Sequence, residues 1–302
     1  MKNRRRQKML ISTPTSPLKR LFDDKGAIEI IAGAGFDAFD MSYLEMFSDP
    51  DNCEINKPTY VKYSEELRRH ADSLGIVCNQ AHAPFHSSCG DPAEDKKKFD
   101  AIVRSMESAA ILGAKNIVVH PKQHLRYSEN KELLREMNIE FYLSLVPYCR
   151  EFGIHVAAEN MWQTSRVGGK IVESTCASPD EFCDYIDSVG NEYIVACLDI
   201  GHCVLVDRKP SEMIKALGRD RLKALHVHDA DGLKDLHTLP FLAGVDFEDM
   251  TTALGEIGYD GDLTFETVNF TGRMPKEIIS DAYKFECSVG RYLASEVEKH
   301  RK

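Results

Sequence analysis

The chain has 302 residues, of which 43% are hydrophobic and 28% are charged, and this balance is typical of a globular protein with enough apolar material for a core. Its 38 basic and 48 acidic residues give a net charge of −10, which disfavours nucleic acid as a partner because an acidic surface repels the phosphate backbone. No C-x-x-C pair occurs among the nine cysteines, and no apolar run reaches 18 residues. The N-terminus carries charge, but no apolar segment typical of a signal peptide follows it. We therefore expect reduced thiols, no signal peptide, no membrane partner and a cytoplasmic location.

The chain begins with a basic run, Arg4-Arg5-Arg6. Charge runs at chain ends are usually solvated, so we expect residues 1–8 to form an N-terminal tail ahead of the first strand.

Short β-branched runs then alternate with longer amphipathic stretches along the whole sequence. A polar residue stands near the end of each predicted strand, and successive polar residues are 27 to 42 positions apart, which leaves room for a helix and two loops. The repeat predicts an α/β fold with a single (β/α)8 TIM barrel domain over residues 1–302; an open doubly wound sheet is the alternative. The predicted strands are Met9–Thr13, Ala38–Ser42, Ile76–His82, Asn116–His120, His155–Glu159, Ile194–Asp199, Lys223–His228 and Asp262–Thr267.

Helix boundaries in the sequence agree with this repeat. The run Ser178-Pro179-Asp180-Glu181 has the form of a capping box with proline at the first helical position. Pro147 falls inside the fourth helical stretch, where we expect it to produce a kink. Glycines stand where helices should end before the next strand, at Gly75, Gly113, Gly153 and Gly190.

Six consecutive predicted strands end in an ionisable side chain. In a barrel the C-terminal ends of all strands lie on one face, so these side chains should converge. Carboxylates crowded without a neighbouring lysine or arginine repel one another, and a divalent cation removes that repulsion. A single strand-end histidine is more often a hydrogen-bonded core residue, but the whole series predicts a metal site. The series is His82, His120, Glu159, Asp199, His226 and Glu266, with His228 following His226.

Two short spacings add further metal-binding side chains. His202 follows Asp199 by one helical turn, and the motif Asp235-Leu-His237 follows the seventh predicted strand. Histidine and carboxylate are ligands for Zn, Mn and Co, and an oxygen-rich site also suits Mg.

At these residues the sequence resembles the xylose isomerase-like TIM barrel superfamily. The resemblance covers essentially the whole chain, and its strongest parts are Cys197-Leu-Asp-Ile-Gly-His202, the stretch from His226-Val-His-Asp to Pro240, and Phe265-Glu266. It implies a metal-dependent sugar or sugar-phosphate isomerase or epimerase in which Glu159, Asp199, His226 and Glu266 bind the ion. It further implies that Glu159 and Glu266 transfer the proton of the substrate carbon through a metal-stabilised enediolate.

Two other functions stay open. The type IV apurinic endonucleases of the same superfamily bind three zinc ions, and their ligand pattern is matched here at every position: His82, His120, Glu159, Asp199, His202, His226, Asp235, His237 and Glu266. A zinc phosphodiesterase is opposed by the net charge of −10 and by the acidic loops at residues 22–25 and 47–51. A non-catalytic sugar-binding barrel is the third reading, because fold does not fix function.

The remaining site residues have open roles. His82, His120, His202, Asp235 and His237 bind either substrate or additional metal, and Trp162 either stacks on a sugar ring or covers the barrel end. No G-x-G-x-x-G follows a strand, so we expect no nicotinamide cofactor. No glycine-rich phosphate loop is seen; Lys122 and Arg273 are the cations near the expected place, although surface charges of this kind are usually solvated. The sequence leaves open whether the chain forms a homo-oligomer.

Overall fold

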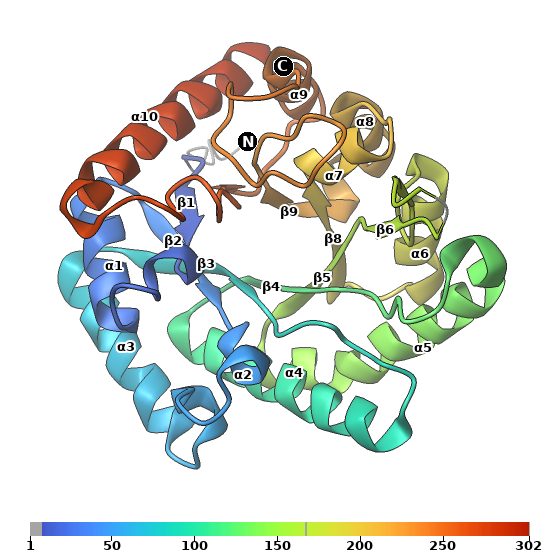
Figure 1. The fold of residues 1–302 in the computed structure, drawn as a ribbon, viewed down its shortest axis with the longest axis horizontal. Coiled ribbons are helices and arrows are strands. Elements are labelled where there is room, and N and C mark those ends of the chain that lie inside the picture. The colour runs from blue at the N-terminus through green and yellow to red at the C-terminus, as the bar shows by residue number, and fades with distance from the viewer. Residues whose placement is uncertain (1–7, 167, 302) are drawn as a thin grey trace, which may run out of the picture.

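The computed structural model describes residues 8–166 and 168–301, and the Arg4-Arg5-Arg6 run lies outside these residues. Its centre is a sheet of eight parallel strands in the order β10-β1-β2-β3-β4-β5-β8-β9, which the helices surround as a ring (Figure 1). The sheet strands are β1 (Ile11–Pro14), β2 (Ala38–Ser42), β3 (Val77–His82), β4 (Asn116–Val119), β5 (His155–Glu159), β8 (Ile194–Asp199), β9 (Leu222–His226) and β10 (Leu263–Thr264).

The two ends of this sheet meet, so the strands form a barrel. Ile11 of β1 pairs with Leu263 of β10, and a parallel bridge joins Val227, just after β9, to Phe265, just after β10. The Val227 amide donates to the Thr264 carbonyl at 2.9 Å, and the Glu266 amide donates to the Val227 carbonyl at 3.0 Å. The predicted (β/α)8 barrel is therefore confirmed, and the open sheet is excluded.

Helices cover the outside of the barrel and enclose most of the hydrophobic core between strand and helix layers. They are α1 (Asp24–Gly33), α2 (Glu45–Ser48), α3 (Tyr60–Leu74), α4 (Pro92–Leu112), α5 (Tyr127–Phe152), α6 (Pro179–Val189), α7 (Ile200–Leu205), α8 (Pro210–Arg221), α9 (Phe247–Glu256) and α10 (Lys276–His300), with 3-10 turns at Ser16–Leu18 and Glu54–Asn56. None of the helices in the described part of the chain is long and apolar enough to cross a membrane.

The inside of the barrel is narrow and partly polar. A small apolar cluster of short side chains lies there, made of Val118, Ala157, Val195, Cys197 and Ala224. Beside it the Ser12 hydroxyl donates to the Thr264 hydroxyl at 2.9 Å and joins the first and last strands. In barrels of this kind, functional sites are built at the C-terminal ends of the strands.

Most predicted boundaries agree with the structure within one or two residues, and the exceptions have local causes. The last strand is shorter than predicted because Asp262 caps the Leu10 amide through its side chain at 3.1 Å and Phe265 forms only an isolated bridge. A two-stranded antiparallel hairpin, β6 (Trp162–Thr164) with β7 (Ile171–Glu173), was not predicted. It lies beside the end of β5 and forms part of the wall of the site described below.

The predictions for helix ends are partly right. All four glycines after helices adopt left-handed conformations, with φ between 59° and 97°, and end α3, α4, α5 and α6. The capping box was wrong: Ser178 does precede α6, but its side chain makes no capping hydrogen bond. Within α5 the non-helical residue is Asn130, where the helix is interrupted, and Pro147 lies inside the helix.

Candidate functional site

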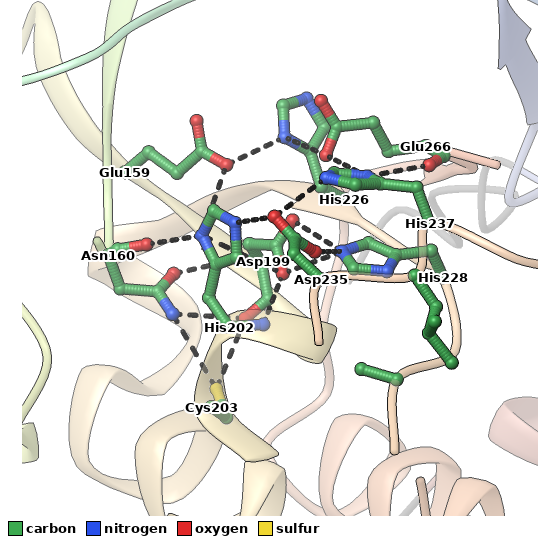
Figure 2. Close-up of polar contacts among 12 residues, drawn as sticks. Glu159, Asn160, Asp199, His202, Cys203, His226, His228, Asp235, His237 and Glu266 are labelled. Carbon is green, nitrogen blue, oxygen red and sulfur yellow. Dashed lines mark hydrogen bonds and ion pairs between the residues drawn. The ribbon is translucent and has the colours of Figure 1, made fainter. Parts of the chain in front are cut away.

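The polar side chains at the strand ends converge on the C-terminal face of the barrel, as Figure 2 shows. Glu159, at the end of β5, lies at the centre of the group and is only 1% exposed. One of its carboxylate oxygens lies 3.0 Å from Nδ1 of His226, and the other lies 2.9 Å from Nε2 of His120. Nε2 of His82 is 3.8 Å from the same carboxylate. Strands β3, β4, β5 and β9 thus each supply one side chain to a single buried cluster.

Asp199 is the last residue of β8 and the N-cap of the short helix α7. Its Oδ1 accepts a hydrogen bond from the His202 amide at 2.6 Å, which fixes the carboxylate at the helix start. Nε2 of His228 lies 3.0 Å from both carboxylate oxygens. The ring of His202 turns back toward the site because its Nδ1 is 2.8 Å from the Asn160 carbonyl.

The loop after β9 brings Asp235 and His237 over the strand ends. Asp235 lies 2.9 Å from Nε2 of His237 and 3.4 Å from Nε2 of His202. It also accepts a hydrogen bond from the indole Nε1 of Trp162 at 3.2 Å, so the hairpin and the loop are joined at this point. His237 has a positive φ of 41° and stacks on His228 with a ring distance of 4.1 Å.

Glu266 follows β10, which lies beside β9 in the closed barrel, and approaches the same place. Its Oε2 lies 3.5 Å from Nδ1 of His226 and 3.4 Å from Nδ1 of His237. Nδ1 of His226 is therefore within 3.5 Å of both Glu159 and Glu266. The two glutamates flank one point in space, although they are far apart in the sequence.

The donor set fits a metal ion. Ligand atoms of Glu159, Asp199, His226 and Glu266 all lie within 4.8 Å of one another, as do those of three further groups. Several buried atoms here have no hydrogen-bond partner, among them His82 Nε2, Asp235 Oδ1 and Glu266 Oε2. Buried polar atoms without partners are costly, and a cation bound between them satisfies them. The three further groups are His202, His228, Asp235 and His237; His82, His226 and Glu266; and His82, His120 and Glu159.

Without a cation the two glutamates have opposite protonation tendencies. Burial raises the pKa of Glu159, but the rings of His226 and His120 outweigh burial and hold it well below its usual range. Burial and the neighbouring carboxylates of Glu159 and Asp199 raise the pKa of Glu266 well above its usual range. The two carboxylates thus have pKa values shifted in opposite directions when no cation is bound.

The pKa values of two histidines in the site also shift in opposite directions. Burial and the neighbouring His120 lower the pKa of His82 to about 3, so its ring is neutral. Its Nδ1 lies 2.8 Å from the Ala83 carbonyl, which leaves Nε2 facing the cluster as a lone-pair donor. Burial lowers the pKa of His202, but Asp199 and Asp235 outweigh it and raise the pKa to about 10.

A cavity of about 370 Å³ opens onto this cluster. Its floor includes Glu159 and Glu266, and aromatic side chains of Phe85 and Trp162 form part of its walls. The full lining is Phe85, His86, His120, Gln123, Glu159, Met161, Trp162, Gln163, Thr164, His202, Asp235, His237 and Glu266. A small polar molecule in this cavity would contact both glutamates.

The structure thus brings together all of the predicted site residues, and the cationic candidates lie elsewhere. The ammonium of Lys122 lies over the ring of Phe141, 5.2 Å from its centroid, and Arg273 is exposed. The sequence prediction gave no role to His228 or to Phe85. For His228 a signal was available, because residues two apart in a strand face the same side and His226 was already part of the predicted site.

Known proteins place this barrel in a family. The family model described as "Xylose isomerase-like TIM barrel" matches residues 28–285. Among curated proteins, the chain is 25% identical over 265 residues to the uncharacterized protein MJ1311 of Methanocaldococcus jannaschii, covering 84% of this chain and 83% of that protein. It is 28% identical over 165 residues to the uncharacterized protein y4fM of Sinorhizobium fredii, covering 54% of this chain and half of that protein.

A third relative is the probable endonuclease 4 of Bacillus velezensis, 28% identical over 216 residues, which cover 65% of this chain and 64% of that protein. Solved structures of the same fold include a D-tagatose 3-epimerase-like protein, at a TM-score of 0.73 and 20% identity, with 96% of this chain and 99% of that chain covered. The IOLI protein with a bound zinc atom has a TM-score of 0.71 at 15% identity, with 97% of this chain and 99% of that chain covered. The match of the family model over most of the chain shows that this protein belongs to the xylose isomerase-like TIM barrel family.

Proposed function

We propose that the protein is a metal-dependent sugar isomerase or epimerase that works by proton transfer between two carboxylates. The observation that carries this proposal is the placement of Glu159 and Glu266, which approach Nδ1 of His226 to 3.0 and 3.5 Å from two different strands. Both carboxylates also face the cavity. A substrate carbon held between them has a proton acceptor on one side and a proton donor on the other.

The donor set Glu159, Asp199, His226 and Glu266 would hold a divalent ion such as Mn, Co, Mg or Zn. Such an ion supplies polarisation of the substrate carbonyl, which acidifies the adjacent carbon–hydrogen bond. Glu159 would remove the proton from that carbon, because its carboxylate lines the cavity. Glu266, which also lines the cavity, would return a proton to the opposite face for epimerisation or to the neighbouring carbon for isomerisation.

The lining of the cavity favours an unphosphorylated sugar. No lysine or arginine is among the described residues that line it, so a phosphate group would find only histidines as cationic partners. Trp162 and Phe85 offer apolar ring faces suited to the carbon–hydrogen face of a sugar ring. Asp235, His202 and His237 would then receive the hydroxyl groups.

A panel of free and phosphorylated ketoses, incubated with metal-loaded protein and followed by NMR, tests this proposal. We expect turnover of at least one unphosphorylated ketose and at least tenfold lower activity on its phosphate ester. Turnover of phosphorylated sugars only would contradict the substrate class, and the absence of turnover across the panel would contradict the reaction. The D-tagatose 3-epimerase-like structure supports the inclusion of C3 epimers in the panel.

A zinc phosphodiesterase acting on abasic DNA is a second candidate. All nine residues of the endonuclease ligand pattern belong to groups that could hold a metal ion, and these include His202, Asp235 and His237. This grouping favours the second candidate. The endonuclease 4 relatives, whose matches cover about two thirds of this chain, support it as well. The net charge of −10 opposes it.

Incubation of zinc-loaded protein with an abasic duplex separates the two candidates. We expect no strand cleavage at submicromolar protein. Cleavage at that concentration, lost on Asp235→Asn substitution, would establish the second candidate in place of the first.

A further inference from the structure

The last helix, α10, carries a row of large apolar side chains on its outer face. Ile278, Phe285 and Tyr292 are 48%, 58% and 53% exposed, and they follow one another at intervals of seven residues. Seven residues are close to two helical turns, so the three side chains form a stripe along one side of the helix. We call these three residues the α10 stripe.

The stripe is not part of the core-facing side of α10. That side is complete without it and packs on the barrel through Ile279, Tyr283, Cys287, Leu293 and Val297, which are each at most 5% exposed. In Figure 1 α10 lies on the outside of the ring beside α1 and α9, so its outer face meets no other helix of this chain. A row of three large exposed apolar side chains on one helix is a candidate contact surface.

We propose that α10 packs antiparallel against α10 of a second copy of this chain, about a two-fold axis at Phe285. The stripe is self-complementary in this arrangement because its residues are evenly spaced about the centre. Phe285 meets Phe285 of the second copy, and Ile278 of each copy meets Tyr292 of the other. A two-fold dimer requires such a surface, since the same patch serves both sides.

Neighbouring side chains leave room for this contact. Ser288 and Ser295 are small and exposed, and they stand one turn to either side of Tyr292, where Ile278 of the second copy would insert. Asp281, on the same face, is held by an intrahelical ion pair with Lys284 at 3.0 Å.

Charge does not oppose the contact either. The exposed acidic residues of α10, Glu277, Asp281 and Glu298, are balanced by three exposed lysines, Lys276, Lys284 and Lys299. The exposed part of this helix is therefore close to neutral, whereas the whole chain carries −10. Two copies repel each other least through a face of this kind.

A neighbouring loop extends the surface at one end. Phe241 and Leu242, 54% and 60% exposed, follow the site loop after β9, and the Phe241 ring lies 5.9 Å from that of Tyr292. In the antiparallel arrangement this loop faces the Ile278 end of the partner helix. Its contribution matters because stable interfaces bury about 1,200–2,000 Å² in total, more than one short helix pair supplies.

The mass of the native protein in solution tests the proposal directly. We expect the full chain at tens of micromolar to have twice its monomer mass of 34.1 kDa, and the variant Phe285→Glu to have the monomer mass. The matched control is Leu143→Glu, which places the same charge at a 44% exposed apolar residue of α5 and should leave the dimer intact. A monomeric wild type, or a Phe285→Glu protein that stays dimeric, would overturn the proposal.

A cross-link tests the position of the axis. In a background with the exposed Cys89 replaced by serine, Phe285→Cys should form a disulfide between two copies under mild oxidation, because the axis brings residue 285 next to itself. Leu143→Cys in the same background should not do so at the same protein concentration. Equal cross-linking of both variants, or of neither, would contradict the assigned axis. Neither readout depends on catalytic activity, so the outcome is independent of the proposed function.

Discussion

At the scale of single residues, two glutamates share one site, and their pKa values shift in opposite directions. The rings of His226 and His120 lower the pKa of Glu159, whereas burial and the carboxylates of Glu159 and Asp199 raise the pKa of Glu266. The identity of these side chains was predictable, because each is the first acid after an apolar strand. Their opposite pKa shifts were not, since these depend on distances of 3 to 4 Å between side chains from different strands.

We expect Glu159→Gln and Glu266→Gln each to lower kcat by about 100-fold or more, because an amide keeps the shape of the carboxyl group but cannot carry the proton. The measurement is steady-state kinetics on a confirmed ketose substrate, with circular dichroism to verify the fold. Glu181→Gln is the matched control: Glu181 is also buried, but it binds the Tyr127 hydroxyl at 2.8 Å, away from the cluster. If both site variants kept rates near that of the control, the two-carboxylate mechanism would be wrong.

His228 shows where residue patterns alone fell short. Its Nε2 lies 3.0 Å from both oxygens of Asp199, and its ring stacks on His237. The sequence marks His228 as a neighbour of the site, but only the structure shows that it orients a carboxylate of the predicted metal site. Residues of this kind orient the side chains that bind a metal, even when they do not bind it themselves.

At the scale of elements, a buried carboxylate on α10 joins the first strand to the last. Glu286 is 1% exposed and accepts hydrogen bonds from the hydroxyls of Thr13 at 2.8 Å and Thr267 at 2.5 Å. Burial raises the pKa of Glu286 to about 7, although both threonine hydroxyls lower it. The sequence predicted the strands that it joins but not this contact, because Glu286 lies on a helix that otherwise packs through apolar residues.

The raised pKa of Glu286 predicts that its contribution to stability decreases as the pH rises. The folded protein keeps the Glu286 proton up to about pH 7, whereas an unfolded glutamate loses it near 4.5. The contribution of Glu286 to the free energy of unfolding is therefore fully present below about pH 4.5 and falls as the pH rises toward 7. Between these two pH values it decreases by about 3 kcal/mol.

We expect the variant Glu286→Gln, which has no such proton to lose, to gain Tm relative to wild type between pH 5 and pH 8. Thermal unfolding of both proteins at the two pH values measures this difference. Glu277→Gln, at an exposed position of the same helix, should show no such change. If the difference in Tm between wild type and Glu286→Gln is the same at both pH values, Glu286 does not titrate in this range.

The hairpin β6–β7 was the element missed by the sequence reading. Its strands have three residues each, too short for a periodic pattern to appear, and its position is set by tertiary contacts. The Gln163 side chain accepts from the Tyr127 amide at 3.1 Å and donates to the Leu125 carbonyl at 2.9 Å. These contacts hold Trp162 over the cavity, and they come from residues far away in the chain.

At the scale of the whole molecule, the barrel was predictable because the strand and helix repeat fills the chain without a break. Closure follows from the number of units, and it brings strand ends from β3 to β10 onto one face. The α10 stripe was not predicted, because the exposure of its apolar side chains is known only from the structure.

Because the predicted ion would join side chains from β5, β8, β9 and the end of β10, we expect its removal to destabilise the barrel. Glu159, Asp199 and Glu266 would then repel one another inside the site. A ligand at 100 times its Kd contributes about 2.7 kcal/mol, which corresponds to a Tm decrease on the order of 5 °C after treatment with a chelator. The same treatment of an Asp199→Asn variant should give a smaller decrease, and an equal decrease would show that this site does not hold the ion.

The transfer of a proton through Glu159 and Glu266 is the central claim, and turnover in heavy water tests it most directly. A proton held by a carboxylate in an open cavity can exchange with solvent before it returns to carbon, whereas a hydride that moves within the sugar cannot. We predict that deuterium appears on the product carbon adjacent to the carbonyl, detected by NMR or mass spectrometry. Product that forms without any deuterium at that carbon would contradict proton transfer and leave the two glutamates as metal ligands alone.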